Sequence, residues 1–324
     1  MSKSQIILDK AVEIINAHAD GLTLIEPGEL PAKTSEIRTR ILDDLGITSE
    51  DPRLNGIRPL DPTAFATMKE LASAGCHLFM RHGEQDSNEK ISALKGAKKK
   101  IAQMQIDNNF HDPITARSAI ELIPQLVLFK YLKEKFGTTF IIHTSNNQRA
   151  LQPAQAISNV LGCALCDSRE LTCINYPNKL TSEQEAVLND GALPWTQEAV
   201  DAVCGEGQYK RIKDDMEARI PVLDDSSIST NTVIIDITHT QQINAVCEAK
   251  GESIQRLKCY GFVMIDRSGN VLVKKDGLYH NELTVSLAAL PAPAYATPST
   301  ASEEPGDVER EEAPAKHIAS ASYS

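Results

Sequence analysis

The sequence has no hydrophobic run that approaches the roughly 20 apolar residues of a bilayer-spanning helix. Positive charge is also in short supply, because 33 Lys and Arg stand against 44 Asp and Glu, for a formal net charge of -11. This balance argues against a general nucleic-acid coat protein. The opening segment has a charge inside its apolar part and no small-residue cleavage site, so a secretory signal is not expected. We expect a cytoplasmic protein with no nucleic-acid or membrane partner.

Cysteines are few and do not form a recognisable framework. There are 7, an odd number, and most lie in apolar, strand-like segments, which indicates reduced thiols rather than disulfides. Cys163 and Cys166 form a C-x-x-C, but no second pair of Cys or His completes a zinc site. We therefore predict no metal and no cofactor. The remaining composition, 41% hydrophobic and 24% charged, is that of an ordinary globular protein.

The 324 residues divide into three parts by pattern. Residues 1–72 predict a helical N-terminal extension, and residues 73–290 alternate between strands and helices. Such alternation favours an α/β fold with a mostly parallel sheet covered on both faces. From residue 291 the chain is rich in Pro, Ala, Ser, Thr and Glu, so residues 291–324 are predicted to be a disordered acidic tail.

Apolar periodicity and turn residues predict the main elements. In the first part, residues 21–33 are expected to form a loop, and Ser35 is expected to cap a helix that runs to about residue 45. The strands and helices expected in the second part cover residues 76–80, 115–136, 139–145, 148–161, 231–239 and 241–250, with a closing hairpin about residues 266–269. His77 and His143, inside two of these strands, are expected to be core histidines.

Charged and imidazole side chains follow three of the predicted strands. Arg81 and His82 end the first strand, Arg149 lies just after the second, and His239 ends the third. Open α/β sheets place their sites at the carboxyl ends of strands, so these side chains are expected at one edge of one sheet. Guanidinium groups match phosphate oxygens, and a neutral imidazole is a nucleophile. Phosphoryl transfer needs these parts.

The same residues carry a family resemblance. The stretch Arg81-His82-Gly83-Glu84 with Asn88, the segment from Asp112 to Thr115, the stretch Ser145-Asn-Asn-Gln-Arg149-Ala-Leu-Gln152, and an apolar strand that ends in His239 occur in this order. In order and spacing the chain resembles the phosphoglycerate-mutase-like branch of the histidine phosphatase superfamily over residues 73–275. The sequence departs from the family at Ser118, Pro153 and Thr240, where Gly, Thr and Gly are usual.

The resemblance implies a three-layer α/β/α phosphoglycerate-mutase-like sandwich and assigns roles to its residues. His82 would become a phosphohistidine, and Arg81, Arg149 and His239 would hold the phosphate. Asn88 would bond a phosphate or ester oxygen, and Ser145 would support the pocket. Residues 176–230 would form a cap or insertion over the site.

The family's proton donor is a Glu in a segment that corresponds to residues 171–177, and here Cys173 stands in its place. A thiol is a poor substitute for a carboxylic acid, because its unperturbed pKa is about 8.5. By proximity in sequence, Glu84 and Glu170 are the candidate acids, and Glu84 is counted among the catalytic residues.

We therefore expect a metal-independent phosphatase that hydrolyses a small phosphorylated metabolite through phospho-His82. The alternatives are a phosphomutase and a phosphate-binding or scaffold protein that has lost turnover because of Cys173. The Glu cluster of residues 303–312 resembles translocation signals of some bacterial effectors, although a solubilising tail is favoured. The sequence does not define the oligomeric state.

Overall fold

The computed structural model describes residues 1–55, 57, 69, 72, 74–177, 179–189, 196–220, 230–252 and 257–275. Residues Met1–Ala288 form one compact unit. The predicted acidic tail, residues 291–324, lies outside the described residues. None of the helices in the described part of the chain is long and apolar enough to cross a membrane.

A six-stranded sheet forms the centre of this unit, with the order β3-β2-β4-β1-β5-β6. Strands β3, β2, β4 and β1 are parallel, and β5 is antiparallel both to β1 and to its hairpin partner β6. The predicted mostly parallel sheet with a closing hairpin is thus confirmed. The strands are β1 (Cys76–Arg81), β2 (Thr139–Thr144), β3 (Leu165–Asp167), β4 (Thr232–Thr238), β5 (Phe262–Asp266) and β6 (Val271–Lys275).

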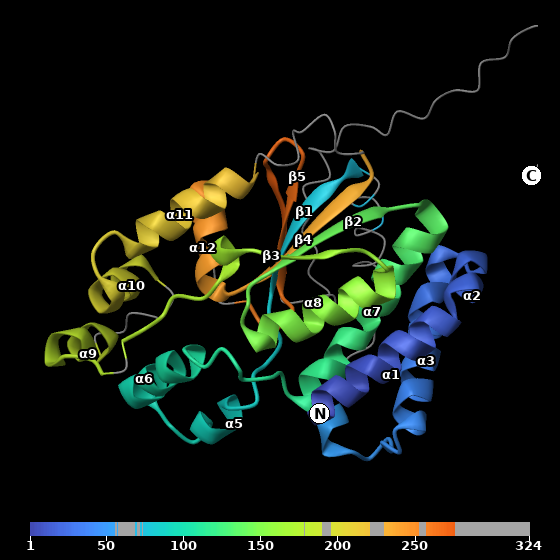
Figure 1. The fold of residues 1–324 in the computed structure, drawn as a ribbon, viewed down its shortest axis with the longest axis horizontal. Coiled ribbons are helices and arrows are strands. Elements are labelled where there is room, and N and C mark those ends of the chain that lie inside the picture. The colour runs from blue at the N-terminus through green and yellow to red at the C-terminus, as the bar shows by residue number, and fades with distance from the viewer. Residues whose placement is uncertain are drawn as a thin grey trace, which may run out of the picture. The chain divides into compact units, whose positions relative to one another are not determined.

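Helices cover the sheet on both faces, which confirms the predicted three-layer architecture (Figure 1). On one face α12 (Thr240–Ala249) contacts β1 and β5, and α11 (Gln208–Arg219) packs on α12. Phe79, Val263, Ile243 and Met216 belong to the buried apolar core of that face. On the other face α8 (Gln148–Leu161) contacts β2 and β4, and α7 (Ala116–Phe136) packs beside α8.

Local signals set the ends of α7 and α8 where the sequence predicts them. The Thr115 side chain accepts a hydrogen bond from the Ser118 amide and caps α7. Gly137 and Gly162 end the two helices in the left-handed conformation, with φ of 64° and 59°. Helix α8, which carries Arg149, begins directly after the short polar loop that follows β2.

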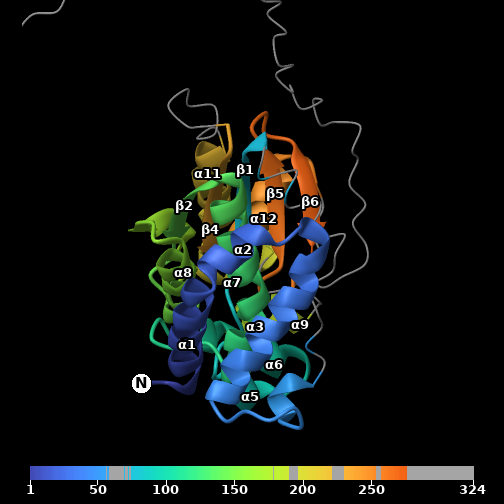
Figure 2. The same ribbon diagram turned by 90° about the vertical axis from the view of Figure 1, so that its right-hand side faces the viewer.

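The N-terminal helices α1 (Lys3–Ala17), α2 (Ala19–Leu24) and α3 (Leu30–Asp44) all pack on α7 (Figure 2). The loop expected over residues 21–33 is wrong, because this stretch holds the end of α2, a 3-10 turn at Pro27–Glu29 and the start of α3. Glu26 and Glu29 form a reciprocal capping box there. Ser35 lies inside α3 and does not cap it; its hydroxyl donates to the Pro31 carbonyl.

A second group of helices lies in the segments that connect the sequence motifs. It comprises α5 (Asn88–Ile91), α6 (Gly96–Asp107), the 3-10 turn η3 (Arg169–Leu171), α9 (Ser182–Asn189) and α10 (Gln197–Cys204). A small apolar cluster joins α6 to α9 and α10 through Met104, Tyr176, Leu188, Ala199 and Val203. The lysines from Lys95 to Lys100 suggest a solvated helix face, and α6 includes three of them; its last residue borders the candidate site. That residues 176–230 form a cap remains a prediction.

Candidate active site

Strand register brings the three predicted strand ends together. Arg81, the last residue of β1, is opposite Thr238, the last residue of β4. On the other side of β4, Thr144 ends β2 opposite Ile237. Parallel strands end at the same edge of a sheet, so His82, His239 and Ser145 each follow a strand at one shared edge. The convergence that the sequence predicted is present in the structure.

Gly83 allows the chain to turn tightly after His82. A Cβ at this position would come within 3 Å of the Tyr260 hydroxyl, the Ser118 hydroxyl and an Ile114 methyl group. Ser118 also accepts a hydrogen bond from the Glu84 amide at 2.8 Å. The residue that departs from the family's usual Gly therefore ties the loop after His82 to the first turn of α7.

His82 is presented as a neutral imidazole with a defined tautomer. Its Nδ1 lies 2.6 Å from the Gly83 carbonyl oxygen, and because a carbonyl only accepts, Nδ1 carries the proton. The lone pair is then on Nε2. Burial, and next the positive charges of Arg149 and its neighbours, hold the pKa of His82 well below its usual range. A buried neutral imidazole is the nucleophilic form.

His239 stands beside His82, with ring centroids 4.8 Å apart. Its Nε2 lies 2.9 Å from the Ser145 hydroxyl, and Arg149 Nη2 approaches its Nδ1 at 3.4 Å. A guanidinium only donates, so Nδ1 accepts and Nε2 donates to Ser145. Burial, followed by the charge of Arg149, lowers the pKa of His239 well below its usual range. Ser145 thus supports the pocket from behind His239, as the resemblance implied.

The two arginines carry the positive charge of the site. Arg149 is fully buried and Arg81 is 7% exposed. Arg81 donates to the Leu257 carbonyl, and Arg149 donates to the Asp107 carbonyl at 3.1 Å. The Nε atom of Arg81 and the Nε and Nη1 atoms of Arg149 are buried without a hydrogen-bond partner among the described residues. Unpaired buried guanidinium donors favour an anion in this pocket.

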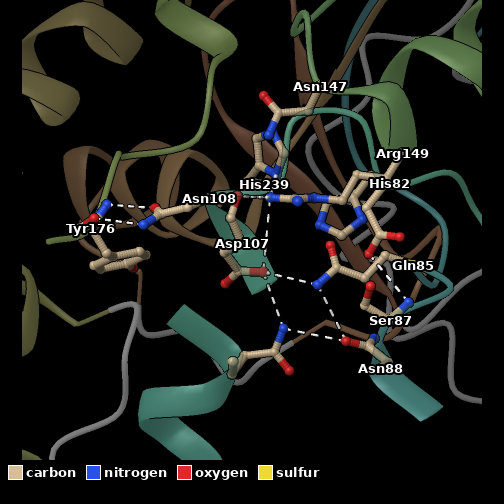
Figure 3. Close-up of polar contacts among 12 residues, drawn as sticks. His82, Gln85, Ser87, Asn88, Asp107, Asn108, Asn147, Arg149, Tyr176 and His239 are labelled. Atoms are coloured by element: carbon tan, nitrogen blue, oxygen red, sulfur yellow. Dashed lines mark hydrogen bonds and ion pairs between the residues drawn. The ribbon is translucent and has the colours of Figure 1, made fainter. Parts of the chain in front are cut away.

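A wall of amides and one carboxylate closes the pocket on the side of α5 and α6. The lining residues are Arg81, His82, Gln85, Asn88, Gln103, Asp107, Arg149, Cys173, His239, Thr240 and Gln241. Figure 3 shows Gln85, Asn88 and Asp107 turned toward one another beside His82, Arg149 and His239. Asn88 is therefore at the pocket, although its carbonyl oxygen is bonded to the amide groups of Gln85 and Gln103.

The candidate acids proposed from sequence do not line this pocket. Glu84 is absent from its lining residues, and its main chain is held by Thr115 and Ser118. Glu170, inside η3, accepts a hydrogen bond from Ser168 and lies 3.7 Å from Arg219. The hydrogen bond from Ser168 lowers the pKa of Glu170, and this residue is also absent from the pocket lining. Neither placement supports a role as proton donor.

Cys173 does line the pocket, where the resemblance places the acid. Its side chain is buried, and burial raises the pKa of the thiol to about 12. Such a thiol stays protonated yet gives up its proton less readily than an ordinary cysteine. The structure therefore leaves the conventional acid position without a carboxylate.

The sequence motifs do not reveal a buried network of ion pairs and hydrogen bonds around a residue of β4. Asp236, fully buried in β4, lies 3.0 Å from His77 Nε2 and 2.9 Å from His143 Nδ1. Arg219 of α11 contacts both of its carboxylate oxygens, at 2.8 and 3.0 Å. Opposite charge and hydrogen bonds keep the pKa of Asp236 well below its usual range in spite of burial. An acidic residue inside an apolar strand is the signal that reveals this network.

Comparisons with known proteins find similar folds at low identity. No family model and no curated protein matches the sequence. The structure is similar to a mycobacterial glucosyl-3-phosphoglycerate phosphatase, with 14% identity, a TM-score of 0.45, and coverage of 62% of this chain and 99% of that chain. It is also similar to YhfR of Bacillus stearothermophilus, with 15% identity, a TM-score of 0.43, and coverage of 63% of this chain and 98% of that chain.

A phosphoserine phosphatase of Entamoeba histolytica, solved with 3-phosphoglyceric acid, is similar at 16% identity and a TM-score of 0.40, over 62% of this chain and 95% of that chain. Identities and TM-scores this low carry no functional conclusion. A family assignment therefore depends on the ordered motifs and on the pocket that they build.

Proposed function

We propose that the chain is a member of the histidine phosphatase superfamily and hydrolyses a small phosphomonoester without a metal ion. The observation that carries this proposal is His82 itself, a buried neutral imidazole whose Nδ1 proton is engaged by Gly83. Its Nε2 lone pair is the group that would attack phosphorus. Unpaired donors of Arg81 and Arg149 lie around it and would bind the equatorial oxygens of the transferring group.

The proposed reaction has two steps. In the first, His82 Nε2 attacks phosphorus, the ester P–O bond breaks, and the alcohol leaves after gaining a proton. In the second, water attacks the phosphohistidine and loses a proton, which restores the one given to the alcohol. The P–N bond breaks, its electron pair returns to His82, and inorganic phosphate leaves. Arg81 and Arg149 neutralise the phosphoryl charge in both steps, so the charge stabilisation comes from side chains of the chain itself.

Release of phosphate from a substrate panel tests this proposal. The panel contains an activated aryl phosphate together with sugar and nucleotide phosphates, and His82→Ala is compared with the wild type, with and without EDTA. We expect release by the wild type that EDTA does not reduce and that the variant lacks. A wild type that is inactive on the aryl ester, which needs little acid assistance, would contradict the proposal.

A second function, phosphate binding without turnover, is favoured by one observation. Cys173 occupies the usual acid position, and burial raises its pKa to about 12. Tight binding of phosphate or vanadate with no turnover of any panel member would support this function. A phosphomutase is distinguished by its product, because a phosphoglycerate would yield its isomer rather than free phosphate.

A further inference from the structure

Asp107, at the end of α6, supplies the carboxylate of the pocket. Among the described residues that line the pocket it is the one acidic side chain. Its Oδ1 lies 3.8 Å from Arg149 Nη2, and its carbonyl accepts a hydrogen bond from the same nitrogen at 3.1 Å. Arg149 in turn contacts His239 at 3.4 Å. The Asp107 carboxylate therefore neighbours Arg149, one of the two arginines that would bind the phosphate.

The amide wall holds this carboxylate in a fixed orientation. The Nε2 atoms of Gln85 and Gln103 each donate to Asp107 Oδ1, at 3.3 and 3.1 Å. The same two nitrogens each donate to Asn88 Oδ1, at 3.3 and 3.4 Å. Two donors and two acceptors thus form a closed ring, which positions Asp107 from both α6 and the loop after His82 (Figure 3). All of the ring's bonds to Asp107 go to Oδ1.

The end of α6 is also fixed against the segment that carries Cys173. Asn108 Nδ2 donates to the Tyr176 carbonyl at 2.6 Å, and the Tyr176 amide donates to Asn108 Oδ1 at 2.7 Å. These reciprocal bonds, visible at one side of Figure 3, place the residue after Asp107 beside the family's usual acid segment. A carboxylate from α6 therefore lies in the part of the pocket where Cys173 leaves none.

We propose that Asp107 is the general acid of the first step and the general base of the second, an inference that rests on the proposed function. In the first step the Asp107 carboxylic acid gives its proton to the leaving ester oxygen and becomes a carboxylate. In the second step that carboxylate takes a proton from the attacking water and is restored. Over the full cycle Asp107 gives up one proton and regains one, so no other acid or base is needed.

Substrate binding supports this assignment. A phosphate dianion on Arg81 and Arg149 would bring negative charge beside Asp107. The carboxyl group would therefore lie next to the ester oxygen that receives the proton in the first step.

The test compares leaving groups in Asp107→Asn. With an alkyl phosphate, whose alkoxide needs a proton, we expect kcat to fall about 10²-fold or more, the usual contribution of general acid catalysis. With an activated aryl phosphate, we expect the pre-steady-state burst of aryl alcohol to remain within about threefold of the wild type and the following steady rate to slow, because the base is lost. The matched control is Asp86→Asn, which changes an exposed carboxylate in the loop after His82 and should alter neither rate.

Three further measurements keep the outcomes distinct. The affinity of Asp107→Asn for inorganic phosphate and its melting temperature should stay near the wild-type values. In the pH profile of kcat for the alkyl ester, the fall at high pH should disappear. If Asp107→Asn does not fold, a steep dependence of wild-type rates on leaving-group pKa would overturn the assignment, and a shallow one would support it.

Loss of the aryl burst by the same factor as alkyl turnover, or unchanged alkyl turnover, would overturn the role of Asp107 while phosphorylation of His82 in the wild type still stood. Absence of a phosphohistidine in the wild type would instead overturn the proposed function. The two failures are therefore separable in one set of preparations.

Discussion

His82 and His239 each occupy the first position after neighbouring parallel strands, and their ring centroids lie 4.8 Å apart with 54° between the planes. Both rings are buried, and Arg149 lowers the pKa of both. The positive charge of the pocket thus comes from guanidinium groups, while the imidazoles stay neutral. This division suits a site where one imidazole attacks phosphorus.

Arg149→Lys should weaken phosphate binding although it preserves the charge. A lysine ammonium is a point charge and does not reproduce the guanidinium donors that are buried here without partners. Loss of a hydrogen bond to a charged group costs about 1.5–3 kcal/mol, so Kd for inorganic phosphate should rise about tenfold or more. Titration calorimetry measures it. Arg117→Lys, from a surface pair with Glu121, is the control and should leave Kd unchanged.

Stability should fall as the pH drops below about 6.5. Burial keeps the folded-state pKa values of His82 and His239 below 6.5, so the unfolded chain binds more protons than the folded chain in this range. Each histidine should contribute a slope that approaches about 1.4 kcal/mol per pH unit. Urea unfolding between pH 7.5 and 5 measures this dependence. The double variant with glutamine at both positions should show a flatter profile, and an unchanged slope would contradict the burial of the two rings.

Gly83→Ala should disable the site through sterics alone. The added Cβ would meet the Tyr260 and Ser118 hydroxyls and an Ile114 methyl group, so the loop that holds His82 must shift. Misplacement of a reacting group by about 1 Å can cost about 10²-fold in rate, and overpacking costs about 1–3 kcal/mol of stability. Burst kinetics and urea unfolding measure the two effects. Gly28→Ala, where a Cβ has open space, should show neither.

Asp236→Asn should destabilise the fold strongly. The substitution removes the buried carboxylate that pairs with half-buried Arg219 and alters the contacts of His77 and His143. Removal of one member of a buried ion pair costs about 3–5 kcal/mol. Asp214→Asn breaks an exposed pair with Lys210 and should cost less than about 1 kcal/mol. Equal losses in the two variants would show that the Asp236 network does not stabilise the fold.

Much of the sheet follows from sequence because β1, β2 and β4 are apolar runs with clear ends, and α7 and α8 end at Gly137 and Gly162. The convergence of His82, Arg149 and His239 follows from the rule that parallel strands end at one edge. The loop prediction for residues 21–33 is wrong because Pro and Gly suggest turns there, whereas Pro in a first helical turn is compatible with the helix.

The position of Asp107 could not be predicted, because it depends on tertiary contacts. The ring that holds Asp107 joins the loop after His82 to a helix about 20 residues later, and Asn108 pairs with a segment 68 residues away. No local periodicity encodes such pairings. Glu84 and Glu170 are candidate acids only because they adjoin motifs in sequence, and neither lines the pocket.

Direct detection of the phosphoenzyme tests the central claim most directly. The wild type would be mixed with an activated aryl phosphate, quenched within the burst at alkaline pH, and mapped by peptide mass spectrometry. The account predicts an acid-labile, base-stable phosphoryl group on His82 that is absent from His82→Ala. Turnover without a phosphoryl group on His82, or a phosphoryl group on another residue, would contradict it.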